Sequence, residues 1–128
     1  MEPTGKNKSV LIIEDETPMR VALWEKLSGM GINVLEADEG VAGLKKALEL
    51  HPDLTMLDII LPKMSGITVL ENLRKDTWGK DAKVVILTLL SDSEIIGKCK
   101  ELGVSEFMVK SEWKIDEVAK RVKQILGV

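Results

Sequence analysis

The chain has 128 residues, of which 45% are hydrophobic and 30% charged, and its formal net charge is −3. This length suits one domain of roughly 100–150 residues and leaves no room for a catalytic domain beside a separate output module. A single cysteine excludes an internal disulfide framework and a cysteine-rich zinc site. No apolar stretch is long enough to cross a membrane, and a mildly acidic chain with 3% aromatic residues is a poor nucleic-acid binder. We therefore expect a small cytoplasmic globular domain.

Five short apolar runs predict β-strands. The polar residues 1–7, which include Pro3 and Gly5, are expected to form a flexible tail before a domain over residues 8–128. Four of the runs are continuously apolar, which is typical of strands buried on both faces of a parallel sheet, whereas the second alternates as an edge strand does. The five runs are Ser9–Ile13, Ile32–Glu36, Leu54–Leu57, Lys83–Leu87 and Glu106–Val109.

The segments between and after these runs carry apolar residues at helical spacing. Thr17 offers an N-cap for the first helix and Pro18 its first helical position, and Gly29 and Gly31 end it. Each of the five segments predicts one helix with a single apolar stripe. The stripes are Val21, Trp24, Leu27 and Met30; then Val41, Leu44, Ala47 and Leu48; then Ile67, Leu70 and Leu73; then Ile95 or Ile96 with Cys99 and Leu102; and finally Ile115, Val118, Val122, Ile125 and Leu126.

The order of these elements predicts the fold. The strands begin about 20–30 residues apart, which is the length of a strand plus a crossover helix. We therefore expect an α/β, (βα)5 protein: a doubly wound parallel sheet of flavodoxin-like order 2-1-3-4-5, with helices on both faces. In such sheets ligands bind beyond the carboxyl ends of the strands, where the strand order reverses.

Polar side chains follow four of the five apolar runs. Because the carboxyl ends of parallel strands meet at one edge of the sheet, we expect these side chains to lie close together. They are Glu14, Asp15 and Glu16 after the first run, Asp58 after the third, Thr88 after the fourth and Lys110 after the fifth.

The chemistry of this group points to phosphoryl transfer. Carboxylates packed together repel each other unless a cation neutralises them, and a site with few carboxylate ligands suits Mg²⁺, which also accepts phosphate oxygens. Asp58 can then attack a phosphoryl group as a carboxylate nucleophile. The Lys110 ammonium would stabilise charge on the transferred group, and Thr88 could donate a hydrogen bond to it.

These motifs resemble those of response-regulator receiver domains over residues 8–127. The matching features are the acidic pair Glu14-Asp15 after VLII, the segment from Asp58 to Gly66 (DIILPKMSG), Thr88 after VVIL and Lys110 after FMV. Each is weak alone, but four in order, each at the end of a predicted strand, are highly specific.

The resemblance implies a signalling switch of the stand-alone type rather than an enzyme, catalysing only its own phosphorylation and dephosphorylation. Asp58 would receive a phosphoryl group from a sensor histidine kinase, a phosphotransfer protein or a small phosphodonor. The implied metal is Mg²⁺ or Mn²⁺, held by Glu14, Asp15, Asp58 and the backbone carbonyl of Ile60.

The resemblance also implies how the switch would act. Thr88 would move toward the phosphoryl group while Phe107 rotates inward, reshaping the surface formed by the fourth helix, fifth strand and fifth helix. A downstream protein effector would bind there, with no direct role for nucleic acid or membrane. Whether phosphorylation also drives formation of a homodimer is left open.

Two positions depart from the family pattern. Ser111 follows Lys110 where proline in a cis peptide is usual, and since a cis non-proline bond costs about 3–4 kcal/mol we expect this bond to be trans. Leu89 follows Thr88 where a small residue is usual. With Ile60 and Leu90 it predicts an apolar surround that slows hydrolysis of a phosphorylated Asp58.

Three alternatives compete with the switch. The first is a phosphorylation-independent binding or scaffold domain with the receiver fold, which Leu89 and Ser111 favour. The second is a receiver fragment of a longer DNA-binding regulator that continues after Val128. The third, an aspartyl-nucleophile phosphatase, is disfavoured because Ile60 stands where that chemistry commonly places a proton-donating acid.

Overall fold

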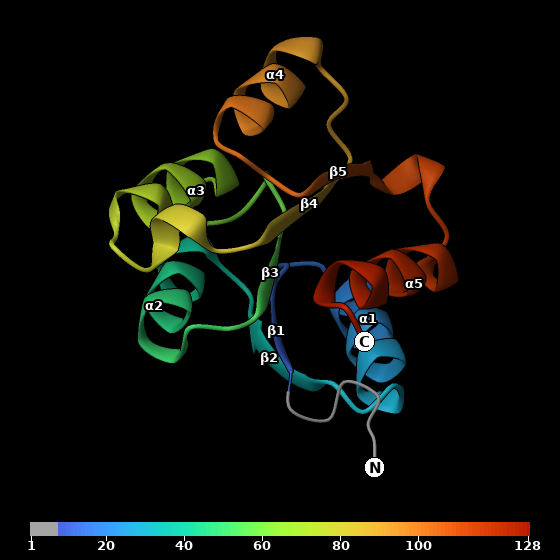
Figure 1. Cartoon of the computed structure of the whole chain (residues 1–128). Coiled ribbons are helices and arrows are strands. Elements are labelled where there is room, and N and C mark those ends of the chain that lie inside the picture. The colour runs from blue at the N-terminus through green and yellow to red at the C-terminus, as the bar shows by residue number, and fades with distance from the viewer. Residues whose placement is uncertain (1–7) are drawn as a thin grey trace.

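A computed structural model describes residues 8–128, which form a five-stranded parallel sheet between two layers of helices (Figure 1). The strand order is β2-β1-β3-β4-β5 and every pair is parallel, which confirms the predicted doubly wound fold. The tail predicted for residues 1–7 lies outside the described residues. The strands are β1 (Ser9–Ile13), β2 (Asn33–Ala37), β3 (Leu54–Leu57), β4 (Val84–Thr88) and β5 (Glu106–Val109).

Five α-helices cover the sheet. The apolar contacts place α1 and α5 on one face and α2, α3 and α4 on the other. Within residues 8–128, none of these helices has the length and apolarity needed to span a membrane. The helices are α1 (Thr17–Gly29), α2 (Gly40–Leu50), α3 (Gly66–Lys75), α4 (Ser93–Glu101) and α5 (Ile115–Leu126), with short 3₁₀ turns at Gly79–Asp81 and Lys110–Glu112.

Two strands begin and end one residue later than predicted. Ile32 is not part of β2, because its N–H donates to the Leu27 carbonyl (3.2 Å) in the turn that ends α1. Thr88 belongs to β4, because it pairs in register with Val109 of β5. The prediction that the second strand lies at an edge of the sheet is confirmed.

The predicted cap of α1 is wrong. Thr17 is already helical, and Glu16 is the N-cap, with its carbonyl accepting from the Arg20 N–H (3.0 Å). The Glu16 side chain makes no capping hydrogen bond and contacts Lys110 instead. The residue that begins the helix therefore also belongs to the edge of the sheet where the polar side chains meet.

The first members of the predicted stripes on α1 and α2 are also wrong. Val21 and Trp24 are each 43% exposed, and α1 buries Leu23, which is not in the predicted stripe, together with the predicted Leu27. On α2 Val41 is exposed, while small residues such as Gly43 and Ala47 face the sheet. A Cβ at Gly43 would lie 2.6 Å from the Ile13 side chain, so the close approach of α2 to β1 requires glycine there. The predicted stripes on α3 and α5 pack into the two cores, and Cys99 of α4 is buried.

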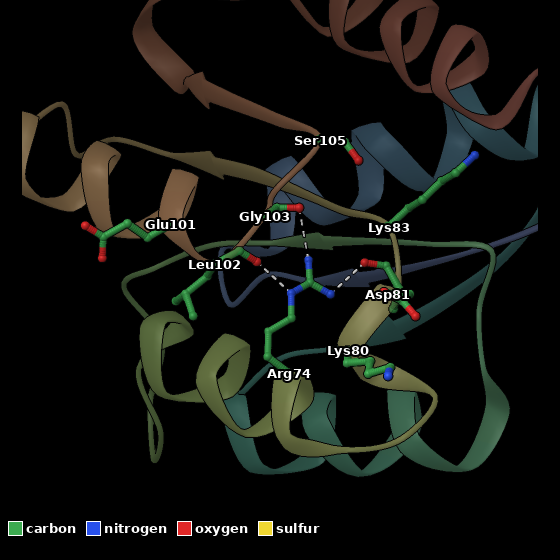
Figure 2. Close-up of a pocket in the computed structure, with 9 residues that line it drawn as sticks. Arg74, Lys80, Asp81, Lys83, Glu101, Leu102, Gly103 and Ser105 are labelled. Carbon is green, nitrogen blue, oxygen red and sulfur yellow. Dashed lines mark hydrogen bonds between the residues drawn. The ribbon is translucent and has the colours of Figure 1, made fainter.

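Arg74 joins α3 to the carboxyl end of α4. Its guanidinium donates to the carbonyls of Leu102 (2.6 Å) and Gly103 (3.2 Å), and also to those of Gly79 (2.8 Å) and Ala82 (2.7 Å). Figure 2 shows this side chain reaching from α3 to the loop between α4 and β5. One half-buried guanidinium therefore satisfies four main-chain carbonyls at the edge of the sheet where β4 and β5 begin.

Candidate functional site

Lys110 lies at the centre of a charge cluster at the carboxyl ends of β1, β3 and β5. Its Nζ lies 2.8 Å from Glu14 Oε1, 2.8 Å from Glu16 Oε1 and 2.9 Å from Asp58 Oδ2. An ammonium has three N–H donors, so each of them has a carboxylate partner. The topology thus brings together residues that are up to 96 positions apart, from Glu14 to Lys110.

Burial sets the electrostatics of this cluster. The side chains of Glu14, Asp58 and Lys110 are 3%, 5% and 4% exposed. Burial raises the pKa of Glu14 above its ordinary value, while hydrogen bonds from Lys110 and from the Glu16 N–H oppose that rise. Burial alone would lower the pKa of Lys110, but the hydrogen bonds to Glu14, Glu16 and Asp58 outweigh it and raise that pKa. Lys110 is therefore a fixed positive charge at neutral pH.

The two oxygens of Asp58 have different partners. Oδ2 faces Lys110, and Oδ1 accepts a hydrogen bond from the Ile60 N–H (3.2 Å). The Asp58 N–H donates to the Ile13 carbonyl (3.1 Å), so the residue continues the pairing of β3 with β1. The strand and the following loop together fix the direction of this carboxylate.

A cavity of about 130 Å³ opens over Asp58. Asp15 is exposed at its rim, and Ile60 and Leu89 supply apolar walls that are 55% and 58% exposed. Leu90, also predicted to surround the site, packs against the core beside α4 instead. The lining residues are Asp15, Glu16, Asp58, Ile60, Leu89 and Lys110.

The carboxylates suit a hard divalent cation. Glu14, Glu16 and Asp58 each present one oxygen, and these oxygens all lie within 4.8 Å of one another. Oxygen ligands are those that Mg²⁺ prefers, so the donor set fits the implied metal. Of the predicted ligands, Glu14 and Asp58 lie in this group, whereas Asp15 and Ile60 line the adjoining cavity.

Glu16 belongs to this cluster of carboxylates, but the sequence motifs do not single it out. It appeared there only as part of an acidic run. Three consecutive acids carry no periodic signal that could have found it, because the chain leaves β1 at Ile13 and bends at Asp15. The hydrogen bond from the Glu16 N–H to Glu14 Oε2 (3.1 Å) is consistent with that local geometry.

The two predicted switch residues, Thr88 and Phe107, do not line the cavity. Thr88 is fully buried at the carboxyl end of β4, where its Oγ1 accepts from the Leu90 N–H (3.5 Å). Phe107 is half-buried and packs against the core on the side of α2, α3 and α4. Across residues 8–128 every peptide bond is trans, so the expectation for Lys110-Ser111 is confirmed.

Comparison with known proteins agrees with this geometry. Residues 10–123 match the family model of the response regulator receiver domain. Chemotaxis protein CheY of Treponema pallidum is 35% identical over 112 residues, which cover 85% of this chain and 76% of that protein. Sporulation initiation phosphotransferase F of Bacillus subtilis is 30% identical over 120 residues, covering 94% of each.

Solved structures agree as well. A putative response regulator from Chloroflexus aurantiacus has a TM-score of 0.83 at 26% identity, covering 99% of this chain and 100% of that one. A CheX–CheY complex with BeF₃ and Mg²⁺ from Borrelia burgdorferi has a TM-score of 0.82 at 28% identity, covering 92% and 88%.

Several curated relatives are longer than the matched region. The alkaline phosphatase synthesis transcriptional regulatory protein PhoP of Bacillus subtilis is 37% identical over 122 residues, which are 94% of this chain but 49% of that protein. The chain thus spans about half the length of such relatives. From its sequence, its topology and its charge cluster, the chain belongs to the response regulator receiver domain family of two-component signalling.

Proposed function

We propose that Asp58 is the phosphoacceptor of a phosphorylation-controlled switch. The observation that carries the proposal is the contact between Lys110 Nζ and Asp58 Oδ2 (2.9 Å) inside a buried acidic cluster that opens to a small cavity. A buried carboxylate that already faces a fixed cation is placed to attack an electrophile and to have the product's charge balanced.

The proposed step is a direct transfer of the phosphoryl group from the donor to Asp58. A carboxylate oxygen of Asp58 forms a bond to phosphorus, while the bond from phosphorus to the donor's imidazole nitrogen or acyl oxygen breaks and its electrons leave with the donor. Lys110 balances negative charge on the transferred oxygens. The Ile60 N–H holds Oδ1, so the carboxylate cannot rotate freely during the attack.

We propose Mg²⁺ or Mn²⁺ as the cofactor, and the closeness of the Glu14, Glu16 and Asp58 oxygens supports these side chains as its ligands. Asp15 and the backbone carbonyl of Ile60 are further ligands in our proposal. When bound, the metal would neutralise the carboxylates and orient the phosphoryl oxygens.

The donors we propose are a sensor histidine kinase, a phosphotransfer protein or a small phosphodonor. Thr88 would donate its hydroxyl hydrogen to the attached phosphoryl group, and Phe107 would follow by turning toward the space that Thr88 leaves. The surface of α4, β5 and α5 would change as a result and bind a downstream protein.

The test uses acetyl phosphate and beryllofluoride with Mg²⁺. We expect Asp58 to gain the mass of one phosphoryl group, and tryptophan fluorescence to change on addition of beryllofluoride. The control is Asp58→Asn, which keeps the size of the side chain and removes the nucleophile. Absence of an Asp58-dependent mass gain, together with no response to beryllofluoride, would contradict the proposal and favour a phosphorylation-independent binding domain.

A further inference from the structure

The loop between β3 and α3, residues 58–65, rests on the amino end of α2. We propose that the amino end of α2 supports the loop and that Gly40 is a positioning residue for the Asp58 site. The inference rests on the proposed function only in taking Asp58 as the phosphoacceptor. The position of the loop, and with it that of the Ile60 backbone, depends on the absence of a side chain at position 40.

Gly40 brings the backbone of α2 against the backbone of the loop. Its N–H donates to the Pro62 carbonyl (3.1 Å). A Cβ built on Gly40 would lie 2.0 Å from the Met64 carbonyl oxygen and 2.8 Å from the Met64 carbonyl carbon. These are main-chain atoms, so no side-chain rotation can relieve the overlap, and either the loop or the helix must move.

The other end of the loop is fixed just as closely. The Gly66 N–H donates to the Ile59 carbonyl (2.8 Å), and a Cβ on Gly66 would lie 2.1 Å from the Asp58 carbonyl oxygen. Between these two anchors Lys63 adopts a left-handed conformation (φ 69°), and the Met64 N–H donates to the Pro62 carbonyl (2.8 Å). The tip of the loop is therefore a tight turn whose backbone has little conformational freedom.

Glu39 adds a second contact between α2 and the loop. Its Oε1 accepts from the Ala42 N–H (2.7 Å) and so caps α2. Its Oε2 lies 3.6 Å from Lys63 Nζ, with the two side chains 17% and 69% exposed. One carboxylate thus fixes the first turn of α2 and faces the turn of the loop that rests on it.

A displacement of the loop would reach Asp58 through Ile60. The loop is short and anchored at Gly66, so a displacement of Pro62 and Met64 has to be absorbed by the residues between Asp58 and Pro62. Ile60 is one of these, and its N–H is the donor to Asp58 Oδ1 (3.2 Å). A side chain at position 40 would therefore disturb the orientation of the phosphoacceptor without touching it.

The experiment compares Gly40→Ala with Gly97→Ala and Gly29→Ala. The two controls make the same change inside α-helices, where nothing lies within 4 Å of the new Cβ. The readouts are the backbone amide shifts of Ile60 and Asp58, the Mg²⁺ affinity measured without any phosphodonor, and the rate of Asp58 phosphorylation. For Gly40→Ala alone we expect shifted amides, and about tenfold or greater weakening of Mg²⁺ binding, as is usual when residues that support ligands are changed.

The result that overturns the inference is a folded Gly40→Ala variant whose Ile60 amide shift and Mg²⁺ affinity match those of the controls. Should Gly40→Ala fail to fold, Glu39→Ala replaces it, with the exposed Glu49→Ala of the same helix as control. We expect Glu39→Ala to shift the Ile60 and Asp58 amides and to weaken Mg²⁺ binding, but by less than Gly40→Ala. Unchanged amide shifts and Mg²⁺ affinity would overturn the inference. If the wild-type protein is not phosphorylated, the proposed function fails, while the amide shifts still decide this inference.

Discussion

The Lys110 ammonium lies 2.9 Å from Asp58 Oδ2 and 2.8 Å from Glu14 Oε1, with all three side chains almost fully removed from solvent. Two buried carboxylates at one sheet edge are tolerable only because a cation lies between them. The same three charged residues therefore serve the stability of the fold and the proposed chemistry.

Replacing Lys110 with methionine should destabilise the protein. The substitution leaves Glu14 and Asp58 buried without their cation, which costs about 3 kcal/mol for a broken buried pair. Mg²⁺ should restore more stability to Lys110→Met than to the wild type, because it can neutralise the same carboxylates. Urea unfolding with and without Mg²⁺ measures both effects. The control is Lys114→Met, at an exposed position. Equal urea midpoints for the two variants would show that Lys110 does not stabilise the fold by neutralising Glu14 and Asp58.

The positions of Asp58, Thr88 and Lys110 could be predicted because each directly follows a run of apolar residues. In a parallel sheet, that placement alone puts them at one edge. The role of Glu16 could not be separated from that of Asp15 in the same way, because three consecutive acids give no indication of which ones face inward.

Other features depend on information that side-chain patterns do not contain. The α1 sequence holds two overlapping stripes, one through Val21 and Trp24 and one through Leu23, and only the packing against α5 and the sheet selects the second. The partners of Arg74 are main-chain carbonyls, which every residue has, so no motif could indicate them.

Gly97→Ala should stabilise the protein. Gly97 lies inside α4, where glycine costs about 1 kcal/mol relative to alanine, and a Cβ there would meet nothing within 4 Å. Tight packing therefore does not explain this glycine. The contrast is Gly79→Ala, whose Cβ would lie 2.1 Å from the Leu73 carbonyl oxygen and which should destabilise. Thermal unfolding of both variants checks the prediction, and a lower midpoint for Gly97→Ala would contradict it.

Arg74→Lys should be strongly destabilising although it keeps the charge. A lysine ammonium cannot reproduce the planar fork that reaches four carbonyls on two segments, so main-chain acceptors lose their partners. With hydrogen bonds from charged groups worth about 1.5–3 kcal/mol each, we expect a loss of about 3 kcal/mol.

Hydrogen exchange locates the effect of that change. Faster exchange should concentrate at the end of α4 and in the loop through Gly103. Arg121→Lys is the matched control, because Arg121 pairs with the side chain of Glu106 on a half-exposed surface. Equal stability of the two variants would count against the anchoring role of Arg74.

Thr55→Val should stabilise the protein. Thr55 is 1% exposed on β3, and its Oγ1 has no hydrogen-bond partner among the described residues. Valine has nearly the same shape and removes the cost of an unsatisfied buried hydroxyl, which is about 1 kcal/mol or more. Denaturant unfolding measures the gain, and the exposed Thr77→Val should change little. A destabilised Thr55→Val would reveal a bond or bound water that the hydroxyl does make.

Leu89→Ala should speed the hydrolysis of phosphorylated Asp58. Leu89 and Ile60 form the apolar walls of the cavity over Asp58, and in our proposal they crowd the path of the attacking water. Removing one wall should raise the dephosphorylation rate roughly threefold to tenfold, which corresponds to about 0.7–1.4 kcal/mol in the barrier. The measurement follows loss of the phosphoryl group after the donor is removed. Val41→Ala, an exposed apolar truncation on α2, is the control. A wild-type half-life of seconds, or equal rates for Leu89→Ala and the wild type, would refute the crowding argument.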